Sequence, residues 1–386
     1  MSPALASLSA DLFRQHTLFD THLPDKQLLI SVIVPARNEA EHLGDTLDAL
    51  RNQQKKDGTP IVWRTYEVLL LLNNCTDQSV VVAHRYQQKY PSFPLRIATI
   101  QLPPEKANVG TARRLLMDEA CQRLTQVGRH DGIIASTDSD TIVDTYWIDQ
   151  ILTEINNGCD VVGGRILTRP DDSPVRVNHL RDVTYRMLKA QLEAHLDPLS
   201  FDPWPRHFQH FGASLALTCA AYKRVGGLPN VPHLEDEALY NALVRTDARI
   251  RKSPFVRVTT STRMQGRVEV GFSEQLRYWQ AMNQANKSQL VEAPAATIRR
   301  FRNQNRLRTI WQNHITSAVS DQLQLIASEL LIDSDWLRQQ LDQARYFGQL
   351  WEKVEMQMAA GEWATHWQPV PISQAIKKLR LFLYDK

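Results

Sequence analysis

Two aspartates separated by one residue, Asp138 and Asp140, have the types and the spacing to hold a cation. They follow the apolar run 133–135, which predicts a short buried strand that ends where the polar residues begin. Side chains at positions i and i+2 of an extended segment point the same way, so both carboxylates can face one ion. Hard divalent cations take oxygen ligands from carboxylates and phosphates. The pair therefore predicts a divalent metal ion shared with a bound phosphate group.

The same Asp-Ser-Asp tripeptide occurs again at residues 333–335, in a different context. There it precedes the amphipathic sequence WLRQQLDQARYFGQLW, which predicts a helix with the tripeptide as its N-cap and first turn. The tripeptide alone therefore decides nothing, and it is the buried strand before the first copy that favours metal binding at Asp138 and Asp140.

The composition limits the class of protein. With 386 residues, of which 43% are hydrophobic, the chain can bury the core of two folded units, or of one large unit with an appendage. The net charge of +3 gives no sign of a nucleic-acid partner.

We expect a cytoplasmic protein, because no apolar run is long enough to span a bilayer and the N-terminus does not resemble a signal peptide. The wide spacing of the cysteines argues against a disulfide framework or a structural zinc site: Cys75, Cys121, Cys159 and Cys219.

The elements that position the acidic pair are predicted by an alternation of apolar runs and amphipathic segments. Strands are expected at 28–34, 66–72, 95–100 and 133–135, and helices at 40–52, 78–90 and 111–124. This alternation predicts an α/β fold with a doubly wound, mostly parallel sheet flanked by helices. We expect residues 1–27 to be a lead-in and residues 266–386 to form a helical C-terminal region.

Ligands of a doubly wound sheet bind at the carboxyl ends of its strands, so the polar residues that follow each strand are candidates for a site. Four consecutive strand ends carry such residues, at 35–39, 73–77, 105–110 and 138–140. The absence of G-x-G-x-x-G after the first strand, and of G-x-x-x-x-G-K-[ST] anywhere, disfavours the usual dinucleotide fold and a phosphate-cradling loop.

The sequence SVIVPARNEAEHLGDTLDAL, at residues 31–50, resembles the opening of family 2 glycosyltransferases, whose GT-A fold begins with a strand, a Pro-x-x-Asn-Glu turn and a helix. Other elements of that family follow in order: Asn108, Gly110, Ala112 and Arg113, then Asp138-Ser139-Asp140, then Phe211-Gly212-Ala213-Ser214, then 222–228, then Glu235-Asp236. The resemblance covers residues 28–265. It implies inverting transfer of a sugar from a nucleoside diphosphate sugar to an acceptor hydroxyl, with Mn²⁺ or Mg²⁺ as the cofactor.

The resemblance also implies roles for single residues. Asp140, with Asp138, would hold the metal ion, and Arg113 would add a bidentate contact to the diphosphate. The donor-binding residues would be Pro35, Ala36, Arg37, Glu39, Asn74, Asp77, Asn108, Gly110, Arg113, Asp138 and Ser139. For Glu39 and Asp77, capping of the following helix remains the open alternative.

Asp236, supported by Glu235, would be the base that takes the proton of the acceptor hydroxyl, and the reverse assignment of the two residues stays open. An acidic first helical turn explains the pair equally well. Contacts with the acceptor or with phosphate are expected from Trp204, His207, His210, Gly212, Ala213, Arg263 and Arg267. For the two histidines, metal binding is a weaker alternative.

The sequence departs from the family pattern at two places, which bear on the nucleobase of the donor and on the type of enzyme. Asn73 and Asn74 replace the usual acid at the second strand end, which leaves uracil and guanine both open as the nucleobase. The segment 263–267 lacks the Gln-x-x-Arg-Trp motif of membrane-bound polysaccharide synthases, which points away from a processive enzyme. The acceptor is a small molecule or a lipid-linked one. The arginines between 299 and 308 indicate a solvated helix face, with a peripheral membrane contact as the alternative.

Two other functions compete with glycosyl transfer. A sugar-phosphate nucleotidyltransferase also uses an α/β sheet and metal-binding carboxylates, but its glycine-rich, arginine-containing first turn is missing. A non-catalytic nucleotide-binding scaffold would need neither Asp140 nor Asp236.

Overall fold

The structure is a computed structural model that describes residues 18–19, 23–169, 173–231, 233–260, 272–313 and 319–385. The chain divides into two compact units, each built from segments distant in sequence. The first comprises Met1–Thr153, Phe211–Asp236 and Val256–Thr260, and the second comprises Glu154–His210, Glu237–Phe255 and Ser261–Lys386. Arg263, Arg267, most of the expected lead-in and the expected boundary near residue 265 lie outside the described residues.

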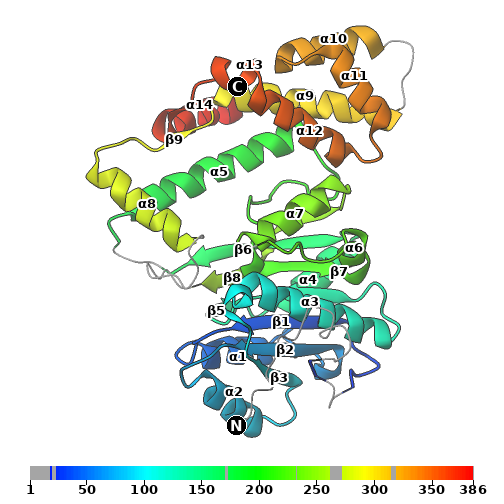
Figure 1. The fold of residues 1–386 in the computed structure, drawn as a ribbon, viewed down its shortest axis with the longest axis vertical. Helices are drawn as coiled ribbons and strands as arrows, with labels where there is room; N and C mark the ends of the chain where they lie inside the picture. Colours follow the sequence, from blue (N-terminus) through cyan, green and yellow to red (C-terminus); the bar gives the residue numbers. More distant parts are fainter. Residues whose placement is uncertain are drawn as a thin grey trace. The chain divides into compact units, whose positions relative to one another are not determined.

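A mostly parallel sheet is the centre of the first unit (Figure 1). Its strands are β1 (Ile30–Ala36), β2 (Tyr66–Asn73), β3 (Leu95–Ile100), β4 (Ile133–Ser136) and β7 (Leu215–Thr218). They lie in the order β3-β2-β1-β4-β7, in which β7 alone of these five is antiparallel to its neighbour. A short strand β5 (Thr141–Val143) pairs antiparallel with the last residues of β8 (Ile250–Thr260). The expected parallel strands are confirmed.

Helices flank this sheet, as the amphipathic segments predict. They are α1 (Leu43–Arg51), α2 (Ser79–Lys89), α3 (Val109–Gln126), α4 (Trp147–Asn156) and α6 (Cys219–Arg224), with the first two residues of α7 (Glu235–Arg245) and the short helices η1 (Trp63–Thr65), η2 (Pro104–Lys106) and η3 (Gly212–Ser214). The chain winds from β1 out to β3, and α3 then carries it back to β4 on the other side of β1. Crossovers between parallel strands are right-handed, so this reversal makes the junction of β1 and β4 the switch point at which ligands of such sheets bind.

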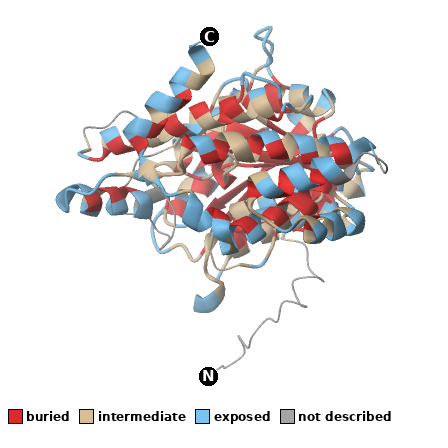
Figure 2. Cartoon of the chain, turned by 90° about the horizontal axis from the view of Figure 1, so that it is seen from above, coloured by how far each residue is buried: buried red, intermediate tan, exposed pale blue. Residues whose placement is uncertain are grey.

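The apolar runs of the sequence become the buried strands of this unit. Every residue of β1 and β2 is buried, which is the pattern expected of strands covered on both faces. Figure 2 shows that the helices, in contrast, carry buried residues on one side and exposed residues on the other.

The second unit is mainly helical. Its strands are β6 (Val161–Thr168) and the first part of β8, and its first long helix is α5 (Arg176–Leu196). The C-terminal helices are α8 (Phe272–Gln284), α9 (Pro294–Asn313), α10 (Val319–Leu330), α11 (Ser334–Gln343), α12 (Phe347–Ala360), α13 (Glu362–His366) and α14 (Ile372–Tyr384). The short strands β9 (Leu290–Val291) and β10 (Val370–Pro371) pair antiparallel. The expected helical C-terminal region is therefore confirmed.

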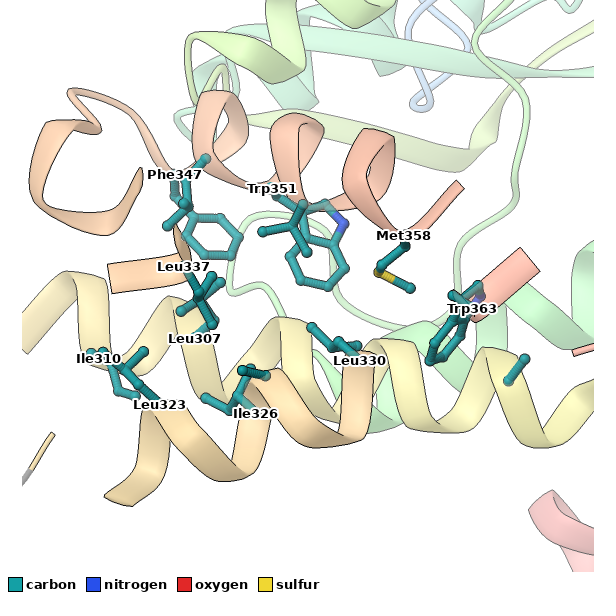
Figure 3. Packing of buried hydrophobic residues seen from close by; sticks show 14 residues of the cluster. Leu307, Ile310, Leu323, Ile326, Leu330, Leu337, Phe347, Trp351, Met358 and Trp363 are labelled. Carbon is teal, nitrogen blue, oxygen red and sulfur yellow. The ribbon is translucent and has the colours of Figure 1, made fainter. Parts of the chain in front are cut away.

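A separate hydrophobic cluster holds the C-terminal helices together (Figure 3). Leu307 from α9, Leu330 from α10, Leu337 from α11 and Trp351 from α12 meet in it, and each is almost fully buried. At the start of α11, the Asp333 carboxylate accepts the Trp336 N–H at 2.7 Å, so this helix is capped by the second copy of the tripeptide, as expected. Among the described residues, no helix is both long enough and apolar enough to span a bilayer.

Candidate active site

The parallel strands β1, β2, β3 and β4 bring their carboxyl ends to one edge of the first unit's sheet. The loops that follow β1 and β4 leave the sheet on either side of the switch point. The four polar segments singled out in the sequence all follow strands at this edge, so the fold brings them to one candidate site.

The turn after β1 is held by hydrogen bonds to neighbouring loops. Pro35 and Ala36 are the last, buried residues of β1, and the exposed Arg37 side chain donates from Nη1 to the Ala107 carbonyl at 2.9 Å. Asn38 has a positive φ of 56°, a conformation that asparagine tolerates better than most residues. Glu39 is buried, and its backbone N–H donates to the Ser79 hydroxyl at 2.7 Å.

The residues after β2 brace this turn. Asn74 exchanges two hydrogen bonds with the Leu102 backbone, donating from Nδ2 to the carbonyl at 2.8 Å and accepting the N–H at Oδ1 at 3.0 Å. Asp77 accepts the Ser79 N–H at 2.9 Å and the Ala40 N–H at 3.1 Å. These contacts favour the capping alternative for Asp77. The Asn74 side chain links the loop after β2 to the segment at Leu102.

The start of α3 lies close to Glu235. Asn108 is the N-cap of the helix, and its Oδ1 accepts the Thr111 N–H at 2.8 Å. A Cβ atom added to Gly110 would lie 3.3 Å from the Cβ of Glu235, so a small residue suits this approach. The N-terminus of a helix favours negative charge, which makes it a suitable neighbour for a carboxylate.

Arg113 joins the two acidic motifs of the sequence. Its guanidinium is buried and donates from Nη2 to Asp138 Oδ1 at 2.7 Å, while its Nη1 is hydrogen bonded to the Glu235 carboxylate. Such charge-assisted contacts at a planar guanidinium fix both distance and orientation. Arg113 was expected to contact phosphate. Its Nη1 and Nη2 donors are instead directed at carboxylates of the protein itself.

The Asp138-Ser139-Asp140 segment forms the tight connection between β4 and β5. The Thr46 hydroxyl of α1 donates to the Ser139 carbonyl at 2.9 Å, and the Thr141 N–H donates to the Asp138 carbonyl at 3.2 Å. The backbone of the motif is therefore fixed from two directions.

Two other carboxylates influence the carboxyl group of Asp138. Burial raises the pKa of Asp138 above its ordinary value; Arg113 acts in the opposite direction, and the charges of Asp140 and Asp236 raise it further. Like charges close together disfavour the ionised form unless a cation joins them. The first unit therefore concentrates negative charge where the two acidic motifs meet.

Asp236 is oriented by the segment that precedes β7. Its Oδ2 accepts the Gly212 N–H at 2.9 Å, and the Gly212 carbonyl in turn accepts the Ser136 hydroxyl at 2.8 Å. Gly212 also lies against the guanidinium of Arg113, since an added Cβ would be 2.6 Å from its Cζ. Ala213 follows in η3 and is buried.

The side chains present suit a divalent cation that shares its coordination with a ligand. Within the described ranges, no three His, Cys, Asp or Glu side chains are grouped so as to hold a metal ion by themselves. Asp138 and Asp140 supply two carboxylates on one turn, and after burial the charge of Asp140 is one of the influences that raise the pKa of Asp138. Water and phosphate oxygens are the usual ligands that complete the coordination of a hard cation.

The expected acceptor residues of the second unit differ in accessibility. Trp204 is 46% exposed, whereas His207 is 1% exposed. Burial lowers the pKa of His207 to about 3, and its Nε2 lies 3.0 Å from the Ser253 carbonyl. His207 is therefore a neutral interior residue and cannot touch an acceptor. His210 stacks on the Tyr240 ring with centroids 3.7 Å apart, and its Nε2 lies 2.6 Å from a Glu237 carboxylate oxygen.

Two residues that brace the site were not among the site residues expected from the sequence. Thr46 lies among the buried residues of α1, and Ser79 is the fully buried first residue of α2. A hydroxyl on an otherwise apolar helix face was the one signal that could have indicated Thr46 from the sequence. For Ser79 no such pattern exists.

Comparison with known proteins gives one family match. Residues 31–215 match the model described as Glycosyl transferase family 2. Two curated relatives, the dolichyl-phosphate beta-glucosyltransferases of Mus musculus and Homo sapiens, are 40% and 38% identical over 81 residues. These alignments cover 20% of this chain and only 23% of each relative's length.

The chain also resembles solved structures at low identity. TarS 1-349 from S. aureus, in complex with UDP-GlcNAc, is 15% identical with a TM-score of 0.45, over 88% of this chain and 92% of that one. The mannosyltransferase PcManGT from Pyrobaculum calidifontis, in complex with GDP-Man and Mn²⁺, is 15% identical with a TM-score of 0.39, over 97% and 93%.

Proposed function

We propose that this chain is a family 2 glycosyltransferase, the family whose model residues 31–215 match, and that it transfers a sugar from a nucleoside diphosphate sugar to an acceptor hydroxyl with inversion at the anomeric carbon. The observation that carries this function is that Arg113 contacts both Asp138 and Glu235, which brings the segment 138–140 and the pair Glu235-Asp236 together beside the switch point of the sheet. Glycosyl transfer needs a site for the leaving diphosphate and a base for the acceptor, and two acidic motifs from distant parts of the chain supply these two functions.

Asp236 is the base in this proposal. As the acceptor oxygen bonds to the anomeric carbon, Asp236 takes its proton, and the electrons of the breaking bond leave with the diphosphate. The Gly212 N–H holds one oxygen of Asp236 and so orients the carboxylate. Glu235 is less suited to this role, because it is buried and ion-paired with Arg113.

Asp140, together with Asp138, holds Mn²⁺ or Mg²⁺ in this proposal. The ion supplies Lewis-acid stabilisation of the negative charge that builds up on the leaving diphosphate. Asp138 is shared with Arg113, which suits a carboxylate that faces the donor ribose while Asp140 carries more of the metal contact.

Arg113 positions these groups. Its guanidinium holds Asp138 on one side and Glu235 on the other, which fixes the distance between the segment 138–140 and the first turn of α7, where Asp236 lies. We assign it this positioning role in place of the direct phosphate contact expected from the sequence.

Nucleotide titration tests the proposal. UDP and GDP are titrated calorimetrically into the full chain with and without Mn²⁺, and the same is done for Asp140→Asn and Asp236→Asn. We expect Mn²⁺ to tighten the binding of one nucleotide at least about tenfold. Asp140→Asn should remove this gain, and Asp236→Asn should keep it while transfer falls at least about 100-fold. The exposed Asp45→Asn serves as the matched control.

Four results would contradict this proposal. The first is that neither nucleotide binds better with metal, and the second is that both variants lose the same donor affinity. Pyrophosphate release from a sugar phosphate and a nucleoside triphosphate would instead identify a nucleotidyltransferase. Donor binding with neither transfer nor hydrolysis would indicate a non-catalytic scaffold.

The acceptor is to be identified with the donor that binds best. Small hydroxyl compounds and lipid-linked acceptors are both screened. Dolichyl phosphate is included because the two curated relatives carry it in their names.

A further inference from the structure

A pocket of about 550 Å³ lies entirely within the second unit. Its walls come from α5, α8, the segment around β9 and the first half of α9, with Phe208 and Lys252 completing the lining. Figure 1 labels these helices and β9. This volume is typical of a site for a small molecule. None of the residues expected from the sequence to bind donor or acceptor lines it.

Three carboxylates line the pocket, and each is already neutralised by a protein cation. The pairs are Asp182 with Arg186 at 2.7 Å, Glu193 with Arg206 at 2.6 Å, and Glu292 with Lys189 at 2.9 Å and Arg300 at 3.3 Å. Although burial alone would raise the pKa of Glu292, Arg300 and Lys189 lower it to about 2. Each of these carboxylates is therefore paired with a protein cation, although burial raises the pKa of Asp182. They give the pocket no preference for a cationic ligand.

Lys252 is the cation of this pocket that has no such partner. Within the described part of the chain, no carboxylate lies within 4.0 Å of its ammonium group, which faces the Tyr240 ring at 5.6 Å from the centroid. Burial alone would lower the pKa of Lys252, but Tyr240 and Glu193 raise it above its ordinary value, so the group is charged. The ammonium group therefore has opposing charge nearby but no direct ion pair, and an anion in the pocket would give it a charge-assisted contact.

The backbone around Lys252 is fixed on both sides. Its N–H donates to Asp202 Oδ1 at 2.9 Å, and its carbonyl accepts the His207 N–H at 3.3 Å. The backbone from which the Lys252 side chain extends is thus held on both sides, which limits the reordering that binding requires.

The rest of the lining suits a polar molecule that has a ring. Tyr278 is 61% exposed, and Trp279 lies beside it as a buried residue. Gln275 and Gln289 add side-chain amides that both donate and accept hydrogen bonds. Aromatic faces combined with amides and ionised groups recognise hydroxyl-rich rings better than purely apolar ones.

We propose that this pocket binds a small carbohydrate-like anion, a sugar phosphate or a sugar acid, and that Lys252 holds its anionic group. Both kinds of ligand have a hydroxyl-bearing ring and an anionic group, which is a phosphate in one and a carboxylate in the other. Tyr278 covers the ring at the exposed side of the pocket.

The experiment is calorimetric titration of the full chain with glucose 6-phosphate, glucuronate, glucose and inorganic phosphate. We expect glucose 6-phosphate or glucuronate to bind more tightly than glucose, and the tighter of the two identifies the anionic group. Lys252→Gln should weaken that binding at least about tenfold, while Lys252→Arg keeps most of it. Lys287→Gln is the matched control, because Lys287 is exposed in the same unit and does not line the pocket.

A second variant separates ring recognition from charge recognition. Tyr278→Ala changes an exposed side chain and should leave the fold intact; it should weaken the binding of the sugar anion but not of inorganic phosphate. The proposal is overturned if neither anion binds more tightly than glucose, or if Lys252→Gln binds as the parent does. Equal affinity for inorganic phosphate and for the better sugar anion would also overturn the assignment of a carbohydrate-sized ligand.

Discussion

Replacement of Arg113 by methionine tests whether this side chain is the link between the two acidic motifs. The guanidinium is 5% exposed and contacts Glu235, which is 6% exposed, and Asp138, which is 35% exposed. Methionine keeps the helical propensity and much of the volume of the side chain but removes the positive charge. It leaves Glu235 as a buried carboxylate without its cation.

The expected loss of stability follows from the exposure of the two partners. Removing one member of a buried ion pair typically costs about 3–5 kcal/mol, because the remaining charge is uncompensated. The contact with Asp138 adds little to this, since water screens a carboxylate that is one-third exposed. We therefore expect Arg113→Met to lower the free energy of unfolding by about 3–5 kcal/mol.

The neighbouring Arg114 offers a matched control. It is 39% exposed and lies 3.8 Å from Asp118 in an i,i+4 pair, so Arg114→Met should cost less than about 0.5 kcal/mol. Urea unfolding followed by circular dichroism measures all variants. In the double variant Arg113→Met/Glu235→Met, most of the loss should be recovered, because two apolar side chains then replace the ion pair.

Equal stabilities of the Arg113→Met and Arg114→Met variants would refute this reasoning. So would a double variant that is less stable than Arg113→Met alone, since Glu235 would then be stabilised by something other than the guanidinium.

Two further predictions concern the same fold. Gly212→Ala places a Cβ 2.6 Å from a guanidinium carbon, so it should lower the free energy of unfolding, measured in urea, by about 1–3 kcal/mol. Gly44 lies in α1, and a Cβ added there meets no atom within 4 Å. Gly44→Ala should therefore stabilise the protein by about 0.5–1 kcal/mol. Similar effects of the two substitutions would contradict the close approach at Gly212. His207 has a folded pKa of about 3, below its ordinary 6.5, so the unfolded chain binds the proton first and stability falls as pH drops through 6.5. Between pH 7.5 and 5 this group should contribute a loss of about 2 kcal/mol, and an unchanged pH dependence in His207→Gln would show that the histidine is not responsible.

The strands of the first unit were predictable because their signal is local. An apolar run such as 66–72 is set by residues that are neighbours in sequence, and burial on both faces needs no knowledge of the partners. The two copies of Asp-Ser-Asp were distinguished in the same way. The residues that precede and follow each copy predicted a strand end at 138–140 and a helix cap at 333–335, and the structure has both elements.

The partners of polar side chains were less predictable. Asn74 and Asp77 follow β2 as the sequence indicates, yet their side chains bind loop backbone at Leu102 and Ala40. Nothing in the sequence shows which loops will lie within hydrogen-bond distance. The burial of His207 is a similar case, because its neighbour Trp204 in the same segment is half exposed.

The sequence by itself therefore determined the order of strands and helices, the edge at which their polar ends gather, and the residues that can carry chemistry there. Only the tertiary structure decided that Arg113 binds carboxylates at Asp138 and Glu235, and that Lys252 lines a pocket without a carboxylate partner among the described residues. The reason is physical. Periodicity reports how each element buries its own surface, whereas the pairing of charges depends on which distant segments the fold brings within a few ångströms.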